Sequence, residues 1–557
     1  MRLLRSFSIT LLGFASLGSA SPTPRPPLAN GIEERGTNVN IGFPGGSVVG
    51  RSLLGVETFN GIPFAEPPVG NLRLRPPQRL ASKLSNFDAT GIAAACPQMF
   101  VSSAATDFIS TLIGSALKIP LLEKLNGQED CLTVSVQRPA GTKAGDDLPV
   151  LFWIFGGGFE LGSSSLYDAT SLLATAVPQG QPFVFVSVNY RVNGFGFLPG
   201  KEVLADGAAN LGLLDQRMAL EWVADNVQAF GGDPSKVTIW GESAGAISGY
   251  DQMLLFNGNA TYKGNDLFRG LIMDSGSIAP AERIDSAKAQ AVYDTVVQEA
   301  GCDGESDTLG CLRQLPYQQF YDAVTSQPGI LSYSSVALSY LPRPDGTVLV
   351  DSPEIMTSGG RMHKVPYILG DQEDEGTLFA LFQNNVTSTD SVVNYLSDLL
   401  FHRASKAQIR TLVNLYPTSL LEGSPFRTGI LNELYPGFKS IGCAAGVQAP
   451  DMPTWSYLSS YDHIVPIMGT FHATDIIQVF YGILPNNAMN SCRTYYFNFL
   501  YNLDPNKGVS GFAKWPRWSD KNQLMWFKTG TSNDILDDDF RKPVSDLLAQ
   551  NPSLYQV

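Results

Sequence analysis

The sequence predicts an α/β fold in which helices cover both faces of a large, mostly parallel sheet. Short continuous apolar runs rich in Val, Ile and Phe recur along the chain, as expected for parallel strands that are buried on both faces. These runs span residues 148–155, 182–188, 236–240, 270–273 and 365–369. Between them lie segments with apolar residues at helical spacing, such as 214–229 and 244–255. Near the start of the chain, NVNIGF and SVVG indicate an antiparallel hairpin instead.

The first residues have the pattern of a secretory signal peptide. Residues 1–20 combine a basic start at Arg2 and Arg5, an apolar stretch, and small residues before a cleavage position. The apolar stretch is too short to span a membrane. A Pro-rich segment follows at 21–37, and the even composition of 38–557, without repeats or a low-complexity linker, predicts a single domain there. We therefore expect a secreted, extracellular protein without a transmembrane anchor.

Composition excludes several classes of protein. The 557 residues include 52 acidic and 38 basic side chains, for a net charge of −14 at pH 7. This charge argues against nucleic acid or an anionic membrane surface as a partner. With 44% hydrophobic residues the chain can bury a large core, so wholesale disorder is excluded. Only four histidines occur, and chemistry that depends on histidine therefore has few places in this chain.

Secretion permits two kinds of covalent modification. The six cysteines allow fifteen disulfide connectivities, and the sequence alone does not select one. Asn259 and Asn385 each begin an N-x-Thr pattern and are candidate glycosylation sites.

The strongest candidate for a nucleophile is Ser243. The apolar run 236–240 leads directly into Gly241-Glu-Ser-Ala-Gly245, and a helical segment follows. This is the strand–turn–helix context of a nucleophile elbow. The two glycines let the backbone pass close to its neighbours and leave the serine hydroxyl exposed. The alternative is a Gly-rich turn that carries a solvated serine.

A second glycine-rich turn is the candidate source of oxyanion donors. The predicted strand 148–155 ends in Gly156-Gly157-Gly158-Phe159, whose backbone N–H groups are not obstructed by side chains. Together with the N–H of Ala244, directly after the candidate nucleophile, they would stabilise a negatively charged oxygen. The alternative is a flexible turn without a catalytic role.

The base of such a site would be one of four histidines. His363 precedes the strand whose exit is expected to carry the acid, and His402 lies among charged helical residues. His463 and His472 remain, on either side of a short apolar run at 464–468 that is typical of a strand. In this class of fold the catalytic loops follow the strands, so the sequence favours His472.

The acid is expected in the loop after the run 365–369. Asp371, Glu373, Asp374 and Glu375 all lie there, and the pattern does not choose among them. The alternative is a solvated acidic loop.

Several longer stretches then resemble the type-B carboxylesterase and lipase family, and most of all its secreted fungal lipases and sterol esterases. They lie at 59–77, 129–139, 153–162, 189–198, 211–246 and 341–346, and include FNGIPFAEPPVGNLRLRPP, WIFGGGFELG and KVTIWGESAGA. The resemblance runs from about residue 38 to near the C-terminus. It implies one α/β-hydrolase domain with a large, mostly parallel central sheet and a lid loop.

The resemblance also assigns roles that the residues alone leave open. The positions that match the family's triad are Ser243 as nucleophile, Glu375 as acid and His472 as base. The positions that match its oxyanion donors are Gly157, Gly158 and Ala244. The positions that match its two disulfides are Cys96–Cys131 and Cys302–Cys311, which leaves Cys443 and Cys492 without an assigned partner.

Three further expectations follow from the same resemblance. The first disulfide loop would carry the lid, because apolar residues between 108 and 117 share one helical face and Pro120 ends the run; the alternative is a helix that faces the core. Leu378 and Phe379 would line an acyl tunnel. The region 438–469 is shorter than the family pattern, which puts the placement of the nearby base in question.

We thus expect a secreted serine hydrolase that cleaves carboxylic esters through an acyl-enzyme, with no metal and no cofactor. The expected substrates are long-chain acyl glycerides or sterol esters at a lipid–water interface. One alternative is a carboxylesterase for short or specialised esters. The other is a catalytically impaired binding member of the fold.

Overall fold

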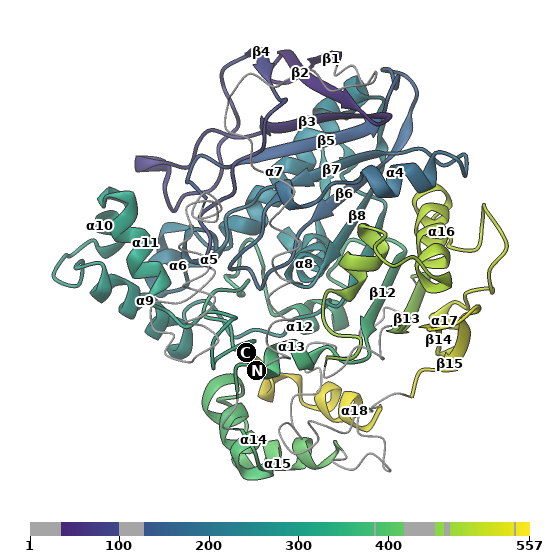
Figure 1. Cartoon of the computed structure of the whole chain (residues 1–557). Helices are drawn as coiled ribbons and strands as arrows, with labels where there is room; N and C mark the ends of the chain where they lie inside the picture. The colour runs from purple at the N-terminus through teal and green to yellow at the C-terminus, as the bar shows by residue number, and fades with distance from the viewer. Residues whose placement is uncertain (1–34, 100–126, 384–385, 417–451, 462–467, 540–541) are drawn as a thin grey trace, which may run out of the picture.

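The computed structural model describes residues 35–99, 127–383, 386–416, 452–461, 468–539 and 542–557. Within these residues, thirteen strands form one twisted sheet that runs through the molecule (Figure 1). Its strand order is β1-β2-β3-β5-β7-β6-β8-β11-β12-β13-β14-β15, and β4 pairs with β2 outside this path.

The centre of the sheet is parallel. Consecutive neighbours from β7 to β14 all pair in the same direction. These strands are β7 (Val184–Val188), β6 (Leu148–Ile154), β8 (Gly232–Glu242), β11 (Gly270–Asp274), β12 (Tyr367–Gln372), β13 (Thr454–Ser460) and β14 (Gln523–Lys528). Five of them contain the apolar runs singled out in the sequence, which confirms the predicted parallel strands.

Antiparallel strands complete the sheet at both edges. They are β1 (Arg35–Ile41), β2 (Gly46–Leu53), β3 (Val56–Pro63), β5 (Thr133–Pro139) and, at the other edge, β15 (Asp534–Asp537); β4 (Leu84–Asp88) pairs with β2 in parallel. The hairpin of β1 and β2 confirms the antiparallel start, and β1 begins at Arg35, slightly before the predicted domain start at 38.

Helices cover both faces of the sheet (Figure 1). The helices α7 (Leu211–Asn226) and α8 (Ala244–Gly258) pack together on one face, and α4 (Thr170–Ala176) and α16 (Asn487–Asn502) pack together on the other. Around this core lie α5 (Asn193–Phe197), α6 (Lys201–Asp206), α9 (Ala287–Glu299), α10 (Thr308–Gln314), α11 (Tyr317–Thr325), α12 (Pro353–Ser358), α13 (Gly376–Ala380), α14 (Thr389–Tyr395), α15 (Lys406–Asn414), α17 (Trp518–Lys521) and α18 (Lys542–Gln550).

Large aromatic side chains fill the core near the carboxyl ends of β6 and β8. Trp153 of β6 and Trp240 of β8 are register partners whose rings meet edge to face at 4.9 Å between centroids. The Phe480 ring lies 5.0 Å from Trp153 and 5.5 Å from Trp240. All three are buried, so the two strands that lead to the candidate oxyanion turn and the candidate nucleophile share one rigid packing layer.

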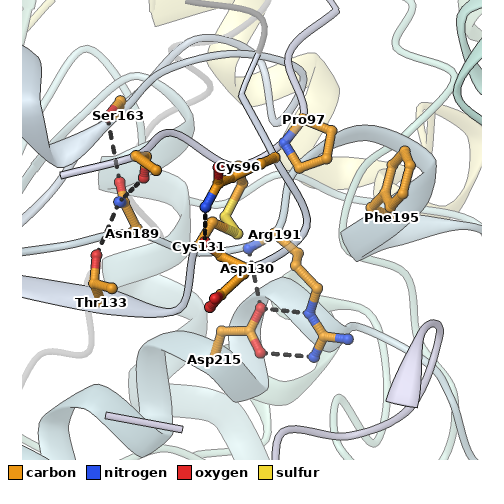
Figure 2. Close-up of a disulfide and its surroundings, with 12 residues drawn as sticks. Cys96, Pro97, Asp130, Cys131, Thr133, Ser163, Asn189, Arg191, Phe195 and Asp215 are labelled. Carbon is orange, nitrogen blue, oxygen red and sulfur yellow. Dashed lines mark hydrogen bonds and ion pairs between the residues drawn. A yellow bond between two sulfur atoms is a disulfide. The ribbon is translucent and has the colours of Figure 1, made fainter. Parts of the chain in front are cut away.

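A disulfide closes the loop that precedes β5. Cys96 and Cys131 are joined, with Cα atoms 5.0 Å apart. Beside it, the Asn189 side chain accepts a hydrogen bond from Ser163 Oγ at 3.4 Å and donates to Thr133 Oγ1 at 3.2 Å (Figure 2). Asn189 therefore links the start of β5, next to Cys131, to the loop that follows β6.

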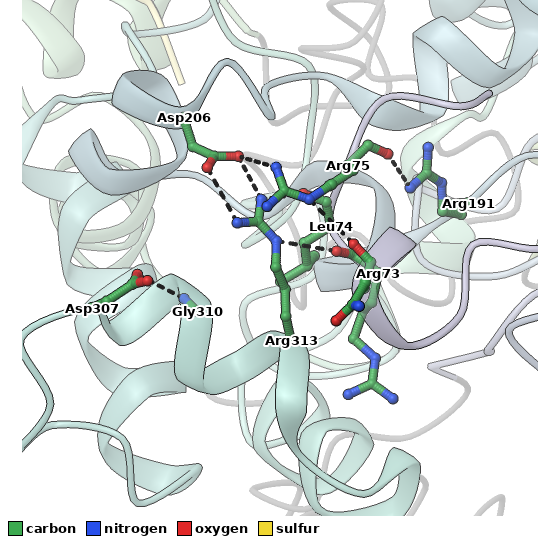
Figure 3. A network of polar contacts seen from close by, with 9 residues as sticks. Arg73, Leu74, Arg75, Arg191, Asp206, Asp307, Gly310 and Arg313 are labelled. Carbon is green, nitrogen blue, oxygen red and sulfur yellow. Dashed lines mark hydrogen bonds and ion pairs between the residues drawn. The ribbon is translucent and has the colours of Figure 1, made fainter.

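An arginine network ties α10 to the chain before the first disulfide. Arg313 of α10 forms an ion pair with Asp206 at 2.5 Å and donates to the carbonyl of Leu74 at 2.8 Å (Figure 3). Arg75 reaches the same carboxylate at 3.6 Å. Nearby, the second predicted disulfide joins Cys302 to Cys311. These contacts hold α10 against α6 and against the chain at residues 74–75.

The structure contains one strand that the sequence did not predict. The strand that leads toward His472 is β13 (Thr454–Ser460), whereas the short strand expected at 464–468 lies almost entirely outside the described residues. Its sequence TWSYLSS mixes polar and apolar residues although all seven are buried, so it lacks the continuous apolar run used to find the other strands.

Several expectations fall on residues that the structure does not describe. These are the signal peptide at 1–20, most of the Pro-rich segment, the lid face between 108 and 117 with Pro120, Asn385, Cys443, His463 and much of 438–469. Among the described residues, no helix is long and apolar enough to cross a membrane.

Candidate active site

Ser243 lies at the end of β8 in a strained turn. Its backbone has φ 55° and ψ −124°, a region that residues with a side chain rarely adopt, and α8 begins at the next residue. The strain is held by close packing: a Cβ on Gly241 would lie 2.3 Å from the carbonyl oxygen of Gly245, and one on Gly245 would lie 2.0 Å from that of Ile154. Only glycine fits at either position, as the elbow interpretation requires.

The loop after β12 and the segment 468–472, which follows β13, meet at the carboxyl ends of the parallel strands. Asp374 and Phe471 form an isolated parallel bridge, and the Asp374 carboxylate accepts a hydrogen bond from Thr470 N at 2.9 Å. Thr377 Oγ1 donates to the carbonyl of Met468 at 2.7 Å. These bonds hold the segment that ends in His472 against the acidic loop.

Among the four acidic candidates, Glu375 is the one whose carboxylate meets the imidazole. Glu375 Oε2 lies 2.5 Å from His472 Nδ1, and Glu375 Oε1 accepts a hydrogen bond from Gln372 N at 2.8 Å. Glu375 is buried, and 12% of the His472 side chain is exposed. The shortened region 438–469 therefore does not separate the histidine from the acid.

The other ring nitrogen of His472 faces Glu242, the residue directly before Ser243. His472 Nε2 lies 3.2 Å from Glu242 Oε1. Burial works to lower the pKa of His472, but the carboxylates of Glu242 and Glu375 outweigh it and raise that pKa to about 9. Burial likewise raises the pKa of the Glu242 carboxyl to about 7, against the opposing effect of His472. The imidazole thus lies between two carboxyl groups.

A buried polar cluster supports the elbow from below. The backbone carbonyl of Asp274 accepts a hydrogen bond from Ser243 N at 2.8 Å. Its carboxylate accepts hydrogen bonds from Trp240 Nε1 at 2.7 Å, Tyr457 OH at 2.9 Å and Tyr496 OH at 2.7 Å. Because these donors come from β8, β13 and α16, one carboxyl group connects three elements behind Ser243.

The candidate oxyanion turn lies beside Ser243. Gly157 and Gly158 have φ of 102° and 63°, which a residue with a side chain would adopt only with strain. A Cβ on the preceding Gly156 would lie 2.9 Å from Ser243 Cβ, so the turn passes directly over Ser243. Gly158 and Ala244 both line the cavity into which Ser243 opens.

That cavity has a volume of about 530 Å³ and contains Ser243, Glu375 and His472 in its wall. The rest of its lining is mainly apolar. Phe379, predicted to line an acyl tunnel, is among these residues, and its ring lies 5.1 Å from that of His472. The lining comes from widely separated segments and includes Ile278, Ile330, Leu341, Phe401, Leu548 and Tyr555.

The other described histidines lie elsewhere. His363 Nε2 is 3.1 Å from the carbonyl of Phe268, and His402 is exposed with Nε2 2.9 Å from the carbonyl of Asp398. Among the described residues, no group of three or more His, Cys, Asp or Glu is arranged to hold a metal ion.

The modification candidates divide between described and undescribed residues. Asn259 is exposed after α8, and its side chain accepts hydrogen bonds from Thr261 N and Thr261 Oγ1. Cys492 is a buried free thiol within α16.

Sequence reasoning missed two residues of the site. Glu242 lies inside the recognised elbow, and its proximity to the nucleophile was the available signal. Asp274 follows a buried strand, as catalytic residues often do in parallel sheets, but its partners on β13 and α16 are distant in sequence.

Comparison with known proteins gives concordant results. A model of the carboxylesterase family matches residues 36–544. The chain is 60% identical to a secreted triacylglycerol lipase of Gibberella zeae, over 97% of each chain, and 52% identical to secreted lipase 1 of Botryotinia fuckeliana, over 94% of this chain and 95% of that one. Its structure is similar to that of Aspergillus niger EstA, with a TM-score of 0.77 at 25% identity, over 94% of this chain and 99% of that chain.

Proposed function

Since the chain belongs to the carboxylesterase family, we propose that Ser243, His472 and Glu375 hydrolyse carboxylic esters through an acyl-enzyme. The protein is a secreted carboxylic ester hydrolase with an α/β-hydrolase fold. The observation that carries the residue assignment is the strained Ser243 in the wall of one apolar cavity with a His472–Glu375 pair.

In the first step Ser243 Oγ attacks the ester carbonyl carbon, and His472 Nε2 takes the hydroxyl proton. The carbonyl oxygen becomes an oxyanion, for which the N–H groups of Gly157, Gly158 and Ala244 are the proposed donors. Glu375 holds Nδ1, fixes the tautomer and stabilises the imidazolium. When the C–O bond of the ester breaks, Nε2 returns the proton to the leaving alcohol.

In the second step water attacks the acyl-serine carbonyl. His472 Nε2 removes a proton from this water, and the same donors stabilise the second oxyanion. Breakdown of the intermediate releases the carboxylic acid and returns the proton to Ser243 Oγ, so the cycle consumes only ester and water.

We propose long-chain acyl glycerides or sterol esters as substrates, met at a lipid–water interface. The apolar lining of the cavity supports this assignment, because buried apolar surface favours long acyl chains at about 0.8 kcal/mol per methylene group. The relative at 60% identity is a triacylglycerol lipase by name. We further propose that 1–20 is a signal peptide, that 21–37 is a Pro-rich segment, that 38–557 is one domain, and that Asn259 is glycosylated.

Ser243→Ala tests the mechanism. We expect kcat for p-nitrophenyl butyrate to fall by at least about 10⁴-fold, since the oxyanion donors alone retain little catalysis. Ser275→Ala is the matched control, because Ser275 lines the same cavity but has no proposed role. A fluorophosphonate should label Ser243 in the wild type, as read by peptide mass spectrometry. Hydrolysis by Ser243→Ala at the wild-type rate would overturn the assignment.

A panel of p-nitrophenyl esters and triacylglycerols from C2 to C18 tests the substrate class. We expect kcat/KM to increase with acyl length and the rate to increase sharply when the substrate exceeds its solubility. A preference for C2–C4 esters without such an increase would instead identify a non-lipolytic carboxylesterase.

A further inference from the structure

Glu160 is a buried carboxyl next to the oxyanion turn that the mechanism above does not use. It follows Gly158 by two residues and is 0% exposed. Its backbone N–H donates to the carbonyl of Gly157 at 3.1 Å, so the residue belongs to the same tight turn. A polar side chain at such a place requires a physical reason, because an apolar one would be buried at less cost.

The Glu160 carboxyl has one polar partner among the described residues. Oε2 accepts a hydrogen bond from Ile330 N at 2.6 Å, while Oε1 has no partner. No described cation forms an ion pair with it, and burial raises the pKa of Glu160 to about 8. Among the described residues, the Glu160 carboxyl is therefore hydrogen-bonded only to the backbone N–H of Ile330, on a loop that is distant in sequence.

Ile330 in turn contacts the oxyanion turn. A Cβ on Gly158 would lie 2.5 Å from Ile330 Cδ1, so the isoleucine packs directly on the Gly158 backbone. Both Gly158 and Ile330 line the cavity that contains Ser243. The carboxyl thus holds the backbone of a residue whose side chain covers the turn and forms the adjacent cavity wall.

The backbone of Glu160 holds a third segment. Its carbonyl accepts a hydrogen bond from Met99 N at 3.0 Å, and the Met99 side chain also approaches Gly329, with Cε 3.3 Å from a Cβ placed there. The chain after the Cys96 disulfide, the oxyanion turn and the loop at 329–330 therefore meet at this residue.

We propose that Glu160 is a positioning residue for ester hydrolysis, which fixes Ile330 over Gly158 and so sets the oxyanion turn and the cavity wall beside Ser243. This inference rests on the proposed function, because it assumes that Gly158 serves the nucleophile Ser243. Glu160 touches no reacting atom. It acts through Ile330. It should therefore stabilise the transition state more than it strengthens substrate binding in the ground state.

Two substitutions separate the hydrogen bond from the shape of the side chain. Glu160→Gln keeps an acceptor for Ile330 N and should retain kcat within about threefold, whereas Glu160→Met keeps the length but removes the acceptor. Because small displacements of oxyanion donors are costly, Glu160→Met should lose about 10- to 100-fold in kcat with a smaller change in KM. It should also bind an alkyl boronic acid, which mimics the tetrahedral intermediate, more weakly by a similar factor. Rates are expressed per active site titrated with a fluorophosphonate.

Two controls distinguish positioning from general stability. Asp251→Leu removes a different buried carboxyl, which has no hydrogen-bond partner among the described residues and lies away from the cavity lining, and should leave kcat per titrated site unchanged. In an Ile330→Ala background, Glu160→Met should lower kcat by less than about threefold, because the side chain through which Glu160 acts is already truncated.

Wild-type kcat in Glu160→Met, or an undiminished effect of that change in the Ile330→Ala background, would overturn the proposal. If Glu160→Met is not secreted, Ile330→Ala alone decides: it should lower kcat by about tenfold, and an unchanged kcat rejects the role. These outcomes leave the proposed function intact, whereas full activity of Ser243→Ala rejects the proposed function itself.

Discussion

At the scale of single residues, the site is defined by an imidazole between two carboxyl groups. His472 Nδ1 meets Glu375, and Nε2 meets Glu242, whose own pKa burial raises to about 7. After the opposing effect of burial, the two carboxylates raise the pKa of His472 to about 9. A protonated imidazole cannot accept the Ser243 proton, so we expect hydrolysis to increase with pH through the range below about 9.

Glu242→Gln tests this electrostatic arrangement. The change removes a negative charge that favours the imidazolium, so the pKa of His472 should fall and the acidic limb of the kcat/KM profile should move to lower pH, by about one unit. Glu354→Gln is the matched control, because Glu354 is a buried carboxyl in the same cavity wall that is bound to Gln556 rather than to the histidine. The measurement is hydrolysis of a soluble ester between pH 5 and 10. An acidic limb that stays in place would show that Glu242 does not act on His472.

At the scale of elements, the candidate active site depends on hydrogen bonds between two segments that follow β12 and β13. Asp374 holds Thr470 N, and a Cβ on Gly469 would lie 2.1 Å from Asp374 Oδ2. The backbone at Gly469 and Thr470 is therefore fitted closely around this carboxylate, and Glu375, the residue after Asp374, reaches His472. The competing acidic residues of this loop thus have different tasks: Asp374 binds backbone and Glu375 binds the imidazole.

Asp374→Ala should separate the two loops. Loss of the acceptor removes the hydrogen bond to Thr470 N and misplaces His472, so we expect kcat to fall by about tenfold or more and the melting temperature to fall by several degrees. Asp374→Asn retains an acceptor oxygen and should recover most of both. Kinetics and thermal unfolding of the two variants check this expectation. Equal losses in Asn and Ala variants would contradict a role for this hydrogen bond.

The elbow allows a second prediction at this scale. Gly245→Ala places a Cβ 2.0 Å from the carbonyl oxygen of Ile154 on the neighbouring strand, and backbone cannot move aside without disturbing β6. We expect this variant to be secreted poorly, as measured by yield. Gly91→Ala, where a Cβ meets nothing within 4 Å, should be produced at the wild-type level. Normal yield and activity of Gly245→Ala would contradict the close packing of the elbow.

The sequence predicted the elements whose pattern is local. The runs that became β6, β8 and β12 are continuous and apolar, and the glycines of the elbow follow directly. The strand β13 was missed because Thr and Ser interrupt its apolar residues although all seven side chains are buried. Choosing Glu375 among its acidic neighbours required family resemblance, since only the fold brings one of them to His472. The sequence could not reveal the role of Glu160 for the same reason, because its hydrogen-bond partner Ile330 lies 170 positions away.

At the scale of the whole molecule, several buried groups keep protons that the unfolded chain releases. Burial raises the pKa of Glu160 from an ordinary 4.5 to about 8, and the pKa of His472 also lies above its ordinary value. Where the native state binds more protons than the unfolded state, the free energy of unfolding decreases as pH rises. The native state should therefore lose stability from about pH 5 to about pH 9, a window set by these two groups.

Thermal unfolding across this pH range checks the linkage. The melting temperature of the wild type should decrease toward alkaline pH, and Glu160→Gln should flatten the dependence because the amide does not titrate. Glu57→Gln is the comparison variant for Glu160→Gln. The Glu57 carboxylate forms an ion pair with Arg138 at 2.7 Å, whereas Glu160 has no such cation among the described residues. A wild-type melting temperature that increases between pH 5 and 9 would contradict this assignment of the buried protons.

The Cys96–Cys131 bond has a consequence for how the enzyme can be altered. It fixes both ends of the segment 100–126, and each flank is also bound to the body of the protein: Gln128 N donates to the carbonyl of Ala95 at 2.9 Å, and Gln98 exchanges hydrogen bonds with Gly162. The two flanks of 100–126 are thus anchored to the body of the protein by covalent and hydrogen bonds of their own. A chimera that carries the corresponding segment of another family member between these flanks should therefore be secreted at the wild-type level, as measured by yield.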